Sequence, residues 1–147
     1  MCGICGVLDY KGDRIKEDLL LRMSHAMSHR GPDDEGYFIE GNIGLANKRL
    51  SIIDVEGGKQ PIFNEDGKIC IVYNGEIYNY LGLRGELEEK GHQFKTRTDT
   101  ETIVHLYEEY GENCVKFLNG MFAFAIWDSK EKKLLLARDR FGIKPLV

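Results

Sequence analysis

The chain opens on a short apolar stretch that carries two thiols, Met1-Cys2-Gly3-Ile4-Cys5-Gly6. Removal of Met1 would leave Cys2 as the first residue, with a thiol and a free α-amine on the same Cα, and its small side chain favours that removal. The reference pKa is about 7.7–8.0 for an α-amine and about 8.5 for a thiol. An unprotonated α-amine can take the thiol proton directly or through one water, so Cys2 is a candidate nucleophile with its own base.

Length and composition indicate one globular domain. The chain has 147 residues, of which 42% are hydrophobic and 30% charged, and its net charge is −4. This charge does not favour nucleic acid or an anionic membrane as a partner. No apolar stretch approaches the roughly 20 residues that span a bilayer, and the N-terminus does not read as a signal peptide. We therefore expect a cytoplasmic protein.

The four cysteines are Cys2, Cys5, Cys70 and Cys114. In the cytoplasm they are expected to be reduced, and the apolar neighbours of Cys70 and Cys114 predict core positions. Cys2-x-x-Cys5 could be half of a zinc site or a redox pair. No second pair of ligands follows at suitable spacing, and residues three apart in a strand point to opposite faces. We therefore favour the nucleophile over a metal or redox pair, and elemental analysis would decide.

Hydrophobic periodicity predicts helices over residues 16–27, 80–90 and 99–110, with a short turn over 112–118. Thr98 and Glu101 have capping-box spacing at the head of the third helix. Strands are predicted over residues 3–9, 36–40, 43–47, 50–53, 69–73, 121–127 and 133–138. Hairpins outnumber alternating strand–helix–strand units, so the pattern predicts an α+β domain with antiparallel sheets.

Further candidates are ambiguous on pattern alone. Asn74-Gly75-Glu76 follows a buried strand, and an asparagine amide beside a glycine N–H could form an oxyanion hole. The alternative is an ordinary Asn-Gly turn. Arg49 and Asp99 carry the two charges needed to hold an amino acid by its α-carboxylate and α-amine. Their alternatives are a surface charge for Arg49 and a helix cap for Asp99.

The histidines give no catalytic pattern. His25 and His29 are four residues apart, as metal ligands can be, but no acidic or thiol group lies near in sequence, so a solvated face is the better interpretation. His92, His105 and the single Trp127 show no arrangement typical of catalysis.

Several motifs, in order along the chain, resemble the class II glutamine amidotransferases, which are N-terminal-nucleophile hydrolases. The opening Met1-Cys2-Gly3-Ile4-x-Gly6 is similar to the start of that family. The remaining motifs resemble the glutaminase domain of glutamine-hydrolysing asparagine synthetases. They are Arg30-Gly31-Pro32-Asp33, Arg49-Leu50-Ser51-Ile52-Ile53-Asp54, Gln60-Pro61, Asn74-Gly75-Glu76-Ile77-Tyr78-Asn79, Gly120-Met121-Phe122-Ala123-Phe124-Ala125 and Arg138-Asp139-Arg140-Phe141-Gly142-Ile143-Lys144-Pro145-Leu146.

This resemblance covers residues 1–147 and implies a four-layer αββα sandwich of two mainly antiparallel sheets flanked by helices. It implies that Cys2 attacks the side-chain amide of glutamine and forms a γ-glutamyl thioester, which water then hydrolyses. The Asn74 side chain and the Gly75 N–H would hold the oxyanion. At Cys5 the family usually has an apolar residue, and we expect a packing variant there.

The resemblance also implies a glutamine pocket. Arg49 would bind the α-carboxylate, while Asp99 and Glu76 would surround the α-amine. Backbone would line the pocket along four residues, Leu50, Ser51, Ile52 and Ile53.

No metal or cofactor is implied for glutamine hydrolysis, since ATP and magnesium belong to the family's synthetase domain. This chain has no phosphate-binding glycine loop and ends on an apolar, uncapped segment, so we expect a fragment or subunit that supplies ammonia to a synthetase. A homodimer is left open. The alternative function is an inactive glutamine-sensing domain, which would follow if Met1 were retained.

Overall fold

The computed structural model describes residues 2–50 and 57–147, which form two antiparallel sheets and their helices. The strands are β1 (Gly3–Leu8), β2 (Asp34–Glu40), β3 (Ile43–Arg49), β4 (Ile62–Phe63), β5 (Ile69–Ile77), β6 (Gly120–Asp128) and β7 (Lys133–Arg138). The helices are α1 (Glu17–Ala26), α2 (Tyr80–Glu89), α3 (Asp99–Tyr110) and the 3-10 helix η1 (Gly111–Lys116).

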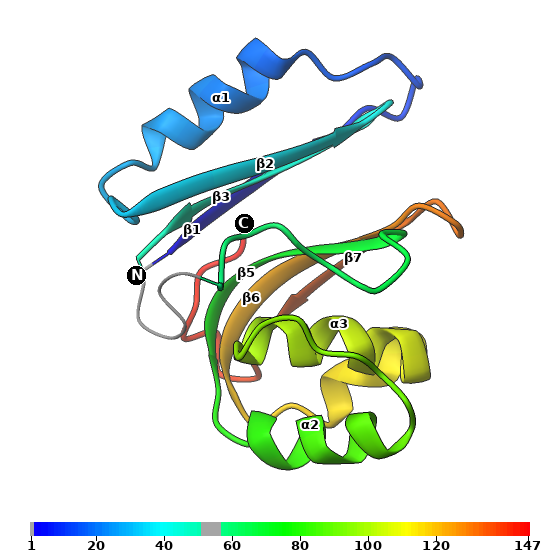
Figure 1. Cartoon of the computed structure of the whole chain (residues 1–147). Coiled ribbons are helices and arrows are strands. Elements are labelled where there is room, and N and C mark those ends of the chain that lie inside the picture. The colour runs from blue at the N-terminus through cyan, green and yellow to red at the C-terminus, as the bar shows by residue number, and fades with distance from the viewer. Residues whose placement is uncertain (1, 51–56) are drawn as a thin grey trace.

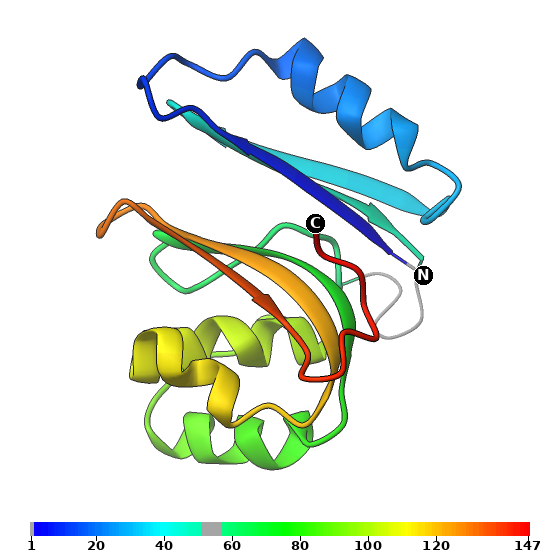
Figure 2. The same ribbon diagram turned by 180° about the vertical axis from the view of Figure 1, so that it is seen from behind.

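These elements stack in four layers. Helix α1 covers the outer face of the sheet β1-β3-β2, and helices α2 and α3 cover the outer face of the sheet β4-β5-β6-β7 (Figures 1 and 2). Every strand pairing is antiparallel. The predicted α+β class and αββα order are therefore confirmed.

Two apolar layers hold the stack together. Between the sheets lies a cluster built on Ile43, Leu45, Cys70, Val72, Ala125 and Trp127. Between the second sheet and its helices lies a larger cluster that includes Cys114 and the fully buried Phe124. Cys70 and Cys114 are thus core residues, as their neighbours in the sequence predict.

The strands near the candidate residues differ from the prediction. β5 does not stop at Tyr73 but continues to Ile77, so Asn74 and Gly75 lie in a strand and pair with Ala123 and Phe122. The Asn-Gly turn is therefore wrong, because β6 is long enough to pair with the whole of this segment. β3 likewise extends to Arg49.

The strand predicted over residues 50–53 is wrong at its first position, because Leu50 lies outside any strand. Ser51, Ile52 and Ile53 lie outside the described residues. The short strand β4 was not predicted, since its two residues offer no alternation to detect.

Two helix ends also differ. The Thr98 side chain accepts a hydrogen bond from Glu101 N at 3.3 Å, which is half of the predicted capping box. The Glu101 carboxylate does not return to Thr98 N; it accepts from the backbone N–H groups of Lys95 and Thr96 at 2.8 and 2.6 Å. Helix α1 ends at Ala26, so His29 lies beyond it and the helical spacing with His25 does not apply.

Candidate active site

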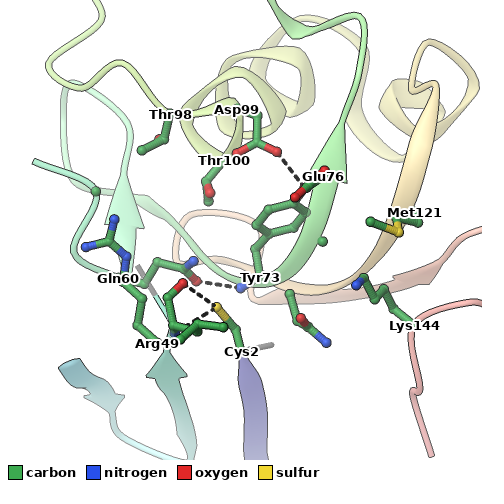
Figure 3. A pocket seen from close by; sticks show the side chains of 14 residues that line it. Cys2, Arg49, Gln60, Tyr73, Glu76, Thr98, Asp99, Thr100, Met121 and Lys144 are labelled. Atoms are coloured by element: carbon green, nitrogen blue, oxygen red, sulfur yellow. Dashed lines mark hydrogen bonds between the residues drawn. The ribbon is translucent and has the colours of Figure 1, made fainter. Parts of the chain in front are cut away.

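A pocket of about 210 Å³ opens where the two sheets meet at one end of the stack. It joins residues from the start and end of the chain with residues from β3, β5, β6 and α3 (Figure 3). Its lining is Cys2, Arg49, Leu50, Gly58, Gln60, Tyr73, Asn74, Gly75, Glu76, Thr98, Asp99, Thr100, Met121 and Lys144. All the predicted site residues that the structure describes therefore lie in one pocket.

Cys2 is half-buried just before β1, whose first residue Gly3 pairs with Lys48 of β3. The Leu50 N–H points at the Cys2 sulfur at 3.4 Å, and the Leu50 carbonyl oxygen lies 3.7 Å from it. Arg30 Nε donates to the Cys2 carbonyl at 3.2 Å. Backbone and side-chain contacts thus hold both the thiol and the peptide group of Cys2 in place.

Asn74 and Gly75 face the pocket from β5. Among the described residues none hydrogen-bonds the Asn74 side chain, so its amide is available to a ligand. At Gly75 an added Cβ would lie 2.3 Å from the Met121 carbonyl oxygen and 2.8 Å from Phe122 Cα. Only glycine fits at this close approach of β5 to β6.

Asp99 is buried at the first position of α3, with 5% of its surface exposed. Its Oδ2 accepts hydrogen bonds from Tyr73 Oη at 2.7 Å and from Ile77 N at 2.9 Å. Burial raises the pKa of this carboxyl, and the hydrogen bonds from Tyr73 and Ile77 oppose that rise. Burial, with the Asp99 charge, also raises the pKa of Tyr73 well above its ordinary value, so Tyr73 acts here as a donor.

Arg49 lies at the end of β3, opposite Asp34 of β2, and only 5% of it is exposed. The alternative of a surface charge is therefore wrong for Arg49. In the close-up view Cys2 lies below the Tyr73 ring, Asp99 lies above it, and Arg49 lies to the left (Figure 3). The pocket thus offers a guanidinium and a carboxylate on separate walls.

Sequence reasoning missed several lining residues, namely Gln60, Tyr73, Thr100, Met121 and Lys144. Gln60 Oε1 accepts from Tyr73 N at 2.7 Å, and Lys144 N donates to Asp139 Oδ2 at 3.0 Å. Gln60, Met121 and Lys144 fall in motifs that carry the family resemblance, which is the one signal that could have marked them. Their contribution depends on folding, which brings residue 144 to the pocket that contains residue 2.

The Cys2-x-x-Cys5 pair does not act as a unit. All four cysteines are free, and Cys5 is absent from the pocket that contains Cys2. Ile4 packs into the cluster between the sheets, so strand alternation turns Cys5 to the opposite face of β1. This geometry does not support a redox or metal-binding pair formed by Cys2 and Cys5.

A family model described as "Glutamine amidotransferase domain" matches residues 1–147. The chain belongs to the glutamine amidotransferase domain family. An asparagine synthetase [glutamine-hydrolyzing] 2 of Bacillus subtilis is 50% identical in an alignment of 149 positions that covers 99% of this chain and 20% of that protein. An asparagine synthetase [glutamine-hydrolyzing] of Triphysaria versicolor is 47% identical over 99% of this chain and 25% of its own length.

The solved structures agree on the amidotransferase fold. A glutamine phosphoribosylpyrophosphate amidotransferase from B. subtilis has a TM-score of 0.77 at 22% identity, covering 98% of this chain and 38% of that one. The structure of an allosteric regulatory enzyme of purine biosynthesis has a TM-score of 0.78 at 22% identity and likewise covers 98% of this chain and 38% of that one. This amidotransferase domain spans a quarter or less of the length of these two asparagine synthetases. Within the described residues, no helix has the length and hydropathy to cross a bilayer.

The cysteines of this amidotransferase domain should differ sharply in reactivity. Burial raises the pKa of Cys70 and Cys114 to about 12, and burial also raises the pKa of Cys5. The thiolate is the reactive form, and a pKa of about 12 leaves roughly one thiolate in 10⁵ at pH 7. Iodoacetamide should therefore label Cys2 first and Cys5 more slowly, and reach the two core thiols only after unfolding. Peptide mass spectrometry measures the order, and labelling of native Cys70 or Cys114 at the rate of Cys2 would contradict it.

Proposed function

We propose that this domain hydrolyses the side-chain amide of L-glutamine to glutamate and ammonia, with Cys2 as the nucleophile. The observation that carries the proposal is the convergence of Cys2, Asn74, Gly75, Arg49 and Asp99 on one pocket. These groups come from four separate segments of the chain. Each has a role in amide hydrolysis, and membership of the amidotransferase family favours that reaction over other thiol chemistry.

The reaction would proceed in two steps after loss of Met1. The Cys2 α-amine takes the thiol proton, and the thiolate attacks the glutamine carboxamide carbon. The oxygen of the tetrahedral intermediate becomes an anion that accepts hydrogen bonds from the Asn74 amide and the Gly75 N–H. The α-ammonium returns its proton to the leaving nitrogen, so ammonia departs and a γ-glutamyl thioester remains. Water, deprotonated by the same amine, then hydrolyses the thioester to glutamate and free thiol.

The pocket walls would orient the amino-acid end of glutamine. We assign the α-carboxylate to the Arg49 guanidinium, which can bind it with two parallel hydrogen bonds. The α-ammonium is assigned to the Asp99 carboxylate, with Glu76 nearby on the same wall. Leu50 contributes backbone beside the sulfur. The family resemblance also assigns glutamine binding to Ser51, Ile52 and Ile53, and we keep that assignment as part of the proposal.

The ammonia would pass to an ATP-dependent synthetase domain or subunit, and asparagine formation is the proposed fate because the two curated relatives quoted above are glutamine-hydrolysing asparagine synthetases. ATP and magnesium would act only there, and the glutaminase step would use no metal or cofactor. Four unpaired cysteines fit a reducing, cytoplasmic setting. Self-association into a homodimer is compatible with this scheme.

The direct test compares the domain with Cys2→Ala and with Cys5→Ala as the matched control. Glutamate release should be lost in Cys2→Ala and kept in Cys5→Ala, because only Cys2 lies in the pocket. Intact-protein mass spectrometry should show that active protein lacks Met1. If the natural protein keeps Met1, binds glutamine and releases no glutamate, the alternative function, an inactive glutamine-sensing domain, is the correct one. Equal activity in Cys2→Ala would exclude the cysteine mechanism.

Asn74→Ala should lower kcat by about 10²–10³-fold, because removal of one oxyanion donor typically has that cost. KM for glutamine should change much less, since the bond forms chiefly to the intermediate. Asn113→Ala, at an exposed position of η1, is the control and should leave both constants unchanged. A loss of kcat below fivefold in folded Asn74→Ala would remove Asn74 from the oxyanion hole.

A further inference from the structure

Two histidines that suggested no function in the sequence lie together with two carboxylates on the helical side of the second sheet. Glu65 comes from the turn between β4 and β5, His92 from the loop after α2, and His105 and Glu108 from α3. One ligand atom from each residue lies within 4.8 Å of all the others. None of the four lines the Cys2 pocket.

The distances among these atoms suit one small ion. His92 Nδ1 lies 3.6 Å from Glu65 Oε1 and 3.5 Å from Glu108 Oε2. His105 Nδ1 lies 3.5 Å from Glu65 Oε2 and 2.8 Å from Glu108 Oε2. Around a tetrahedral zinc ion with bonds of about 2.0–2.1 Å, neighbouring ligand atoms are about 3.3–3.4 Å apart. The 3.5 Å distance between His92 and Glu108 already comes close to this spacing. The two histidines face different oxygens of Glu65, so a single Glu65 oxygen would have to turn toward the ion. The 2.8 Å contact between His105 and Glu108 is a hydrogen bond, which the ion would replace.

His92 has a carboxylate behind its ring, since its Nε2 lies 3.0 Å from Glu109 Oε1. Metal-binding histidines commonly present their second nitrogen to a carboxylate in this way, because that contact selects the tautomer and orients the ring. His105 Nε2 is buried 3.7 Å from Glu101 Oε1, beyond hydrogen-bond distance, and has no hydrogen-bond partner among the described residues. Both Nδ1 atoms face the carboxylates of the cluster, His92 toward Glu65 and Glu108 and His105 in a hydrogen bond with Glu108.

The two carboxylates are held from outside the cluster as well. Glu108 Oε1 accepts a hydrogen bond from Asn64 Nδ2 at 2.7 Å, which leaves Oε2 toward the histidines. Glu65 Oε1 accepts from Gln93 N at 2.9 Å. The Glu65 and Glu108 side chains are 34% and 22% exposed, so an ion can reach the cluster from solvent.

We propose that Glu65, His92, His105 and Glu108 bind one divalent transition-metal ion of the zinc class. Two imidazole nitrogens and two carboxylate oxygens are a ligand set that zinc accepts in tetrahedral geometry. The ion would link the β4–β5 turn and the loop after α2 to helix α3. The first residue of α3 is Asp99, which lines the Cys2 pocket, so metal binding would also stabilise the position of that helix at the pocket.

The competing occupant is a proton. Burial lowers the pKa of His105, but the neighbouring Glu101, Glu108 and Glu65 raise it to about 9. Without a metal, the cluster would then be a network of ion pairs around an imidazolium. Direct metal binding separates the two cases, since an ion-pair network alone does not retain zinc.

The test uses the whole domain, freed of metal with a chelator and titrated with Zn²⁺ by calorimetry. We expect one zinc ion per chain and a rise in Tm on zinc addition. His92→Asn removes a proposed ligand, so it should abolish the Tm rise and weaken binding by at least roughly 10–100-fold, the loss typical when only a group that supports a ligand is removed. His25→Asn is the matched control, since His25 is exposed on α1, and it should bind zinc as the natural sequence does. Circular dichroism in chelator checks that both variants are folded.

Cobalt identifies the ligands independently of stability. The Co²⁺ form should show the visible bands of tetrahedral nitrogen and oxygen ligation, without the charge-transfer band of a thiolate. A thiolate band would place the ion on the cysteines and overturn the proposal. Equal zinc affinity in folded His92→Asn, or no zinc binding by the natural sequence at micromolar concentrations, would overturn it as well.

Discussion

The packing of the two sheets against each other is the constraint on which the active-site geometry depends. Side chains alternate along a strand, so residues two apart share a face. Ile4, Leu45 and Val72 lie in the apolar cluster between the sheets. Two residues away on the same face lie Cys2, just before β1, Asn47 of β3 and Asn74 of β5. The pocket is therefore the polar continuation of the core between the sheets.

Asn47 marks the change from apolar to polar on this face. It is fully buried, and its Nδ2 donates to the Tyr73 carbonyl of the opposite sheet at 3.2 Å. Arg49 follows two residues later and reaches the pocket. Any slip of β3 against β1 by one residue would turn Asn47 and Arg49 away from the second sheet. The register of β3 against β1 therefore decides whether Arg49 reaches the pocket.

A second constraint comes from the helical layer. The Asp99 carboxylate ties the start of α3 to β5 through Tyr73 and Ile77, so a proposed substrate ligand is also a structural anchor. The proposed metal ligands His105 and Glu108 lie further along the same helix. Helix α3 would therefore be fixed at both ends, by β5 at its start and by the metal cluster toward its end.

Much of this could be predicted from the sequence, and the failures have physical causes. Periodicity located the three α-helices, and the apolar strands predicted antiparallel sheets, because both signals are local. The strand prediction ends at Tyr73 and leaves a turn open at Asn74-Gly75, since nothing near this pair in sequence shows that β6 pairs with it. Pocket residues such as Tyr73 and Lys144, and the cluster around His92 and His105, depend on contacts between distant segments. Such contacts have no local pattern, and only the family motifs pointed toward the pocket residues.

The most direct measurement of the central claim is a crystal structure of the Met1-processed Cys2→Ala domain with L-glutamine. The account predicts the carboxamide oxygen within hydrogen-bond distance of the Asn74 amide and the Gly75 N–H. It also predicts the α-carboxylate on Arg49 and the α-ammonium on Asp99. Glutamine bound outside this pocket, or inside it with its carboxamide directed toward Arg49, would contradict the account.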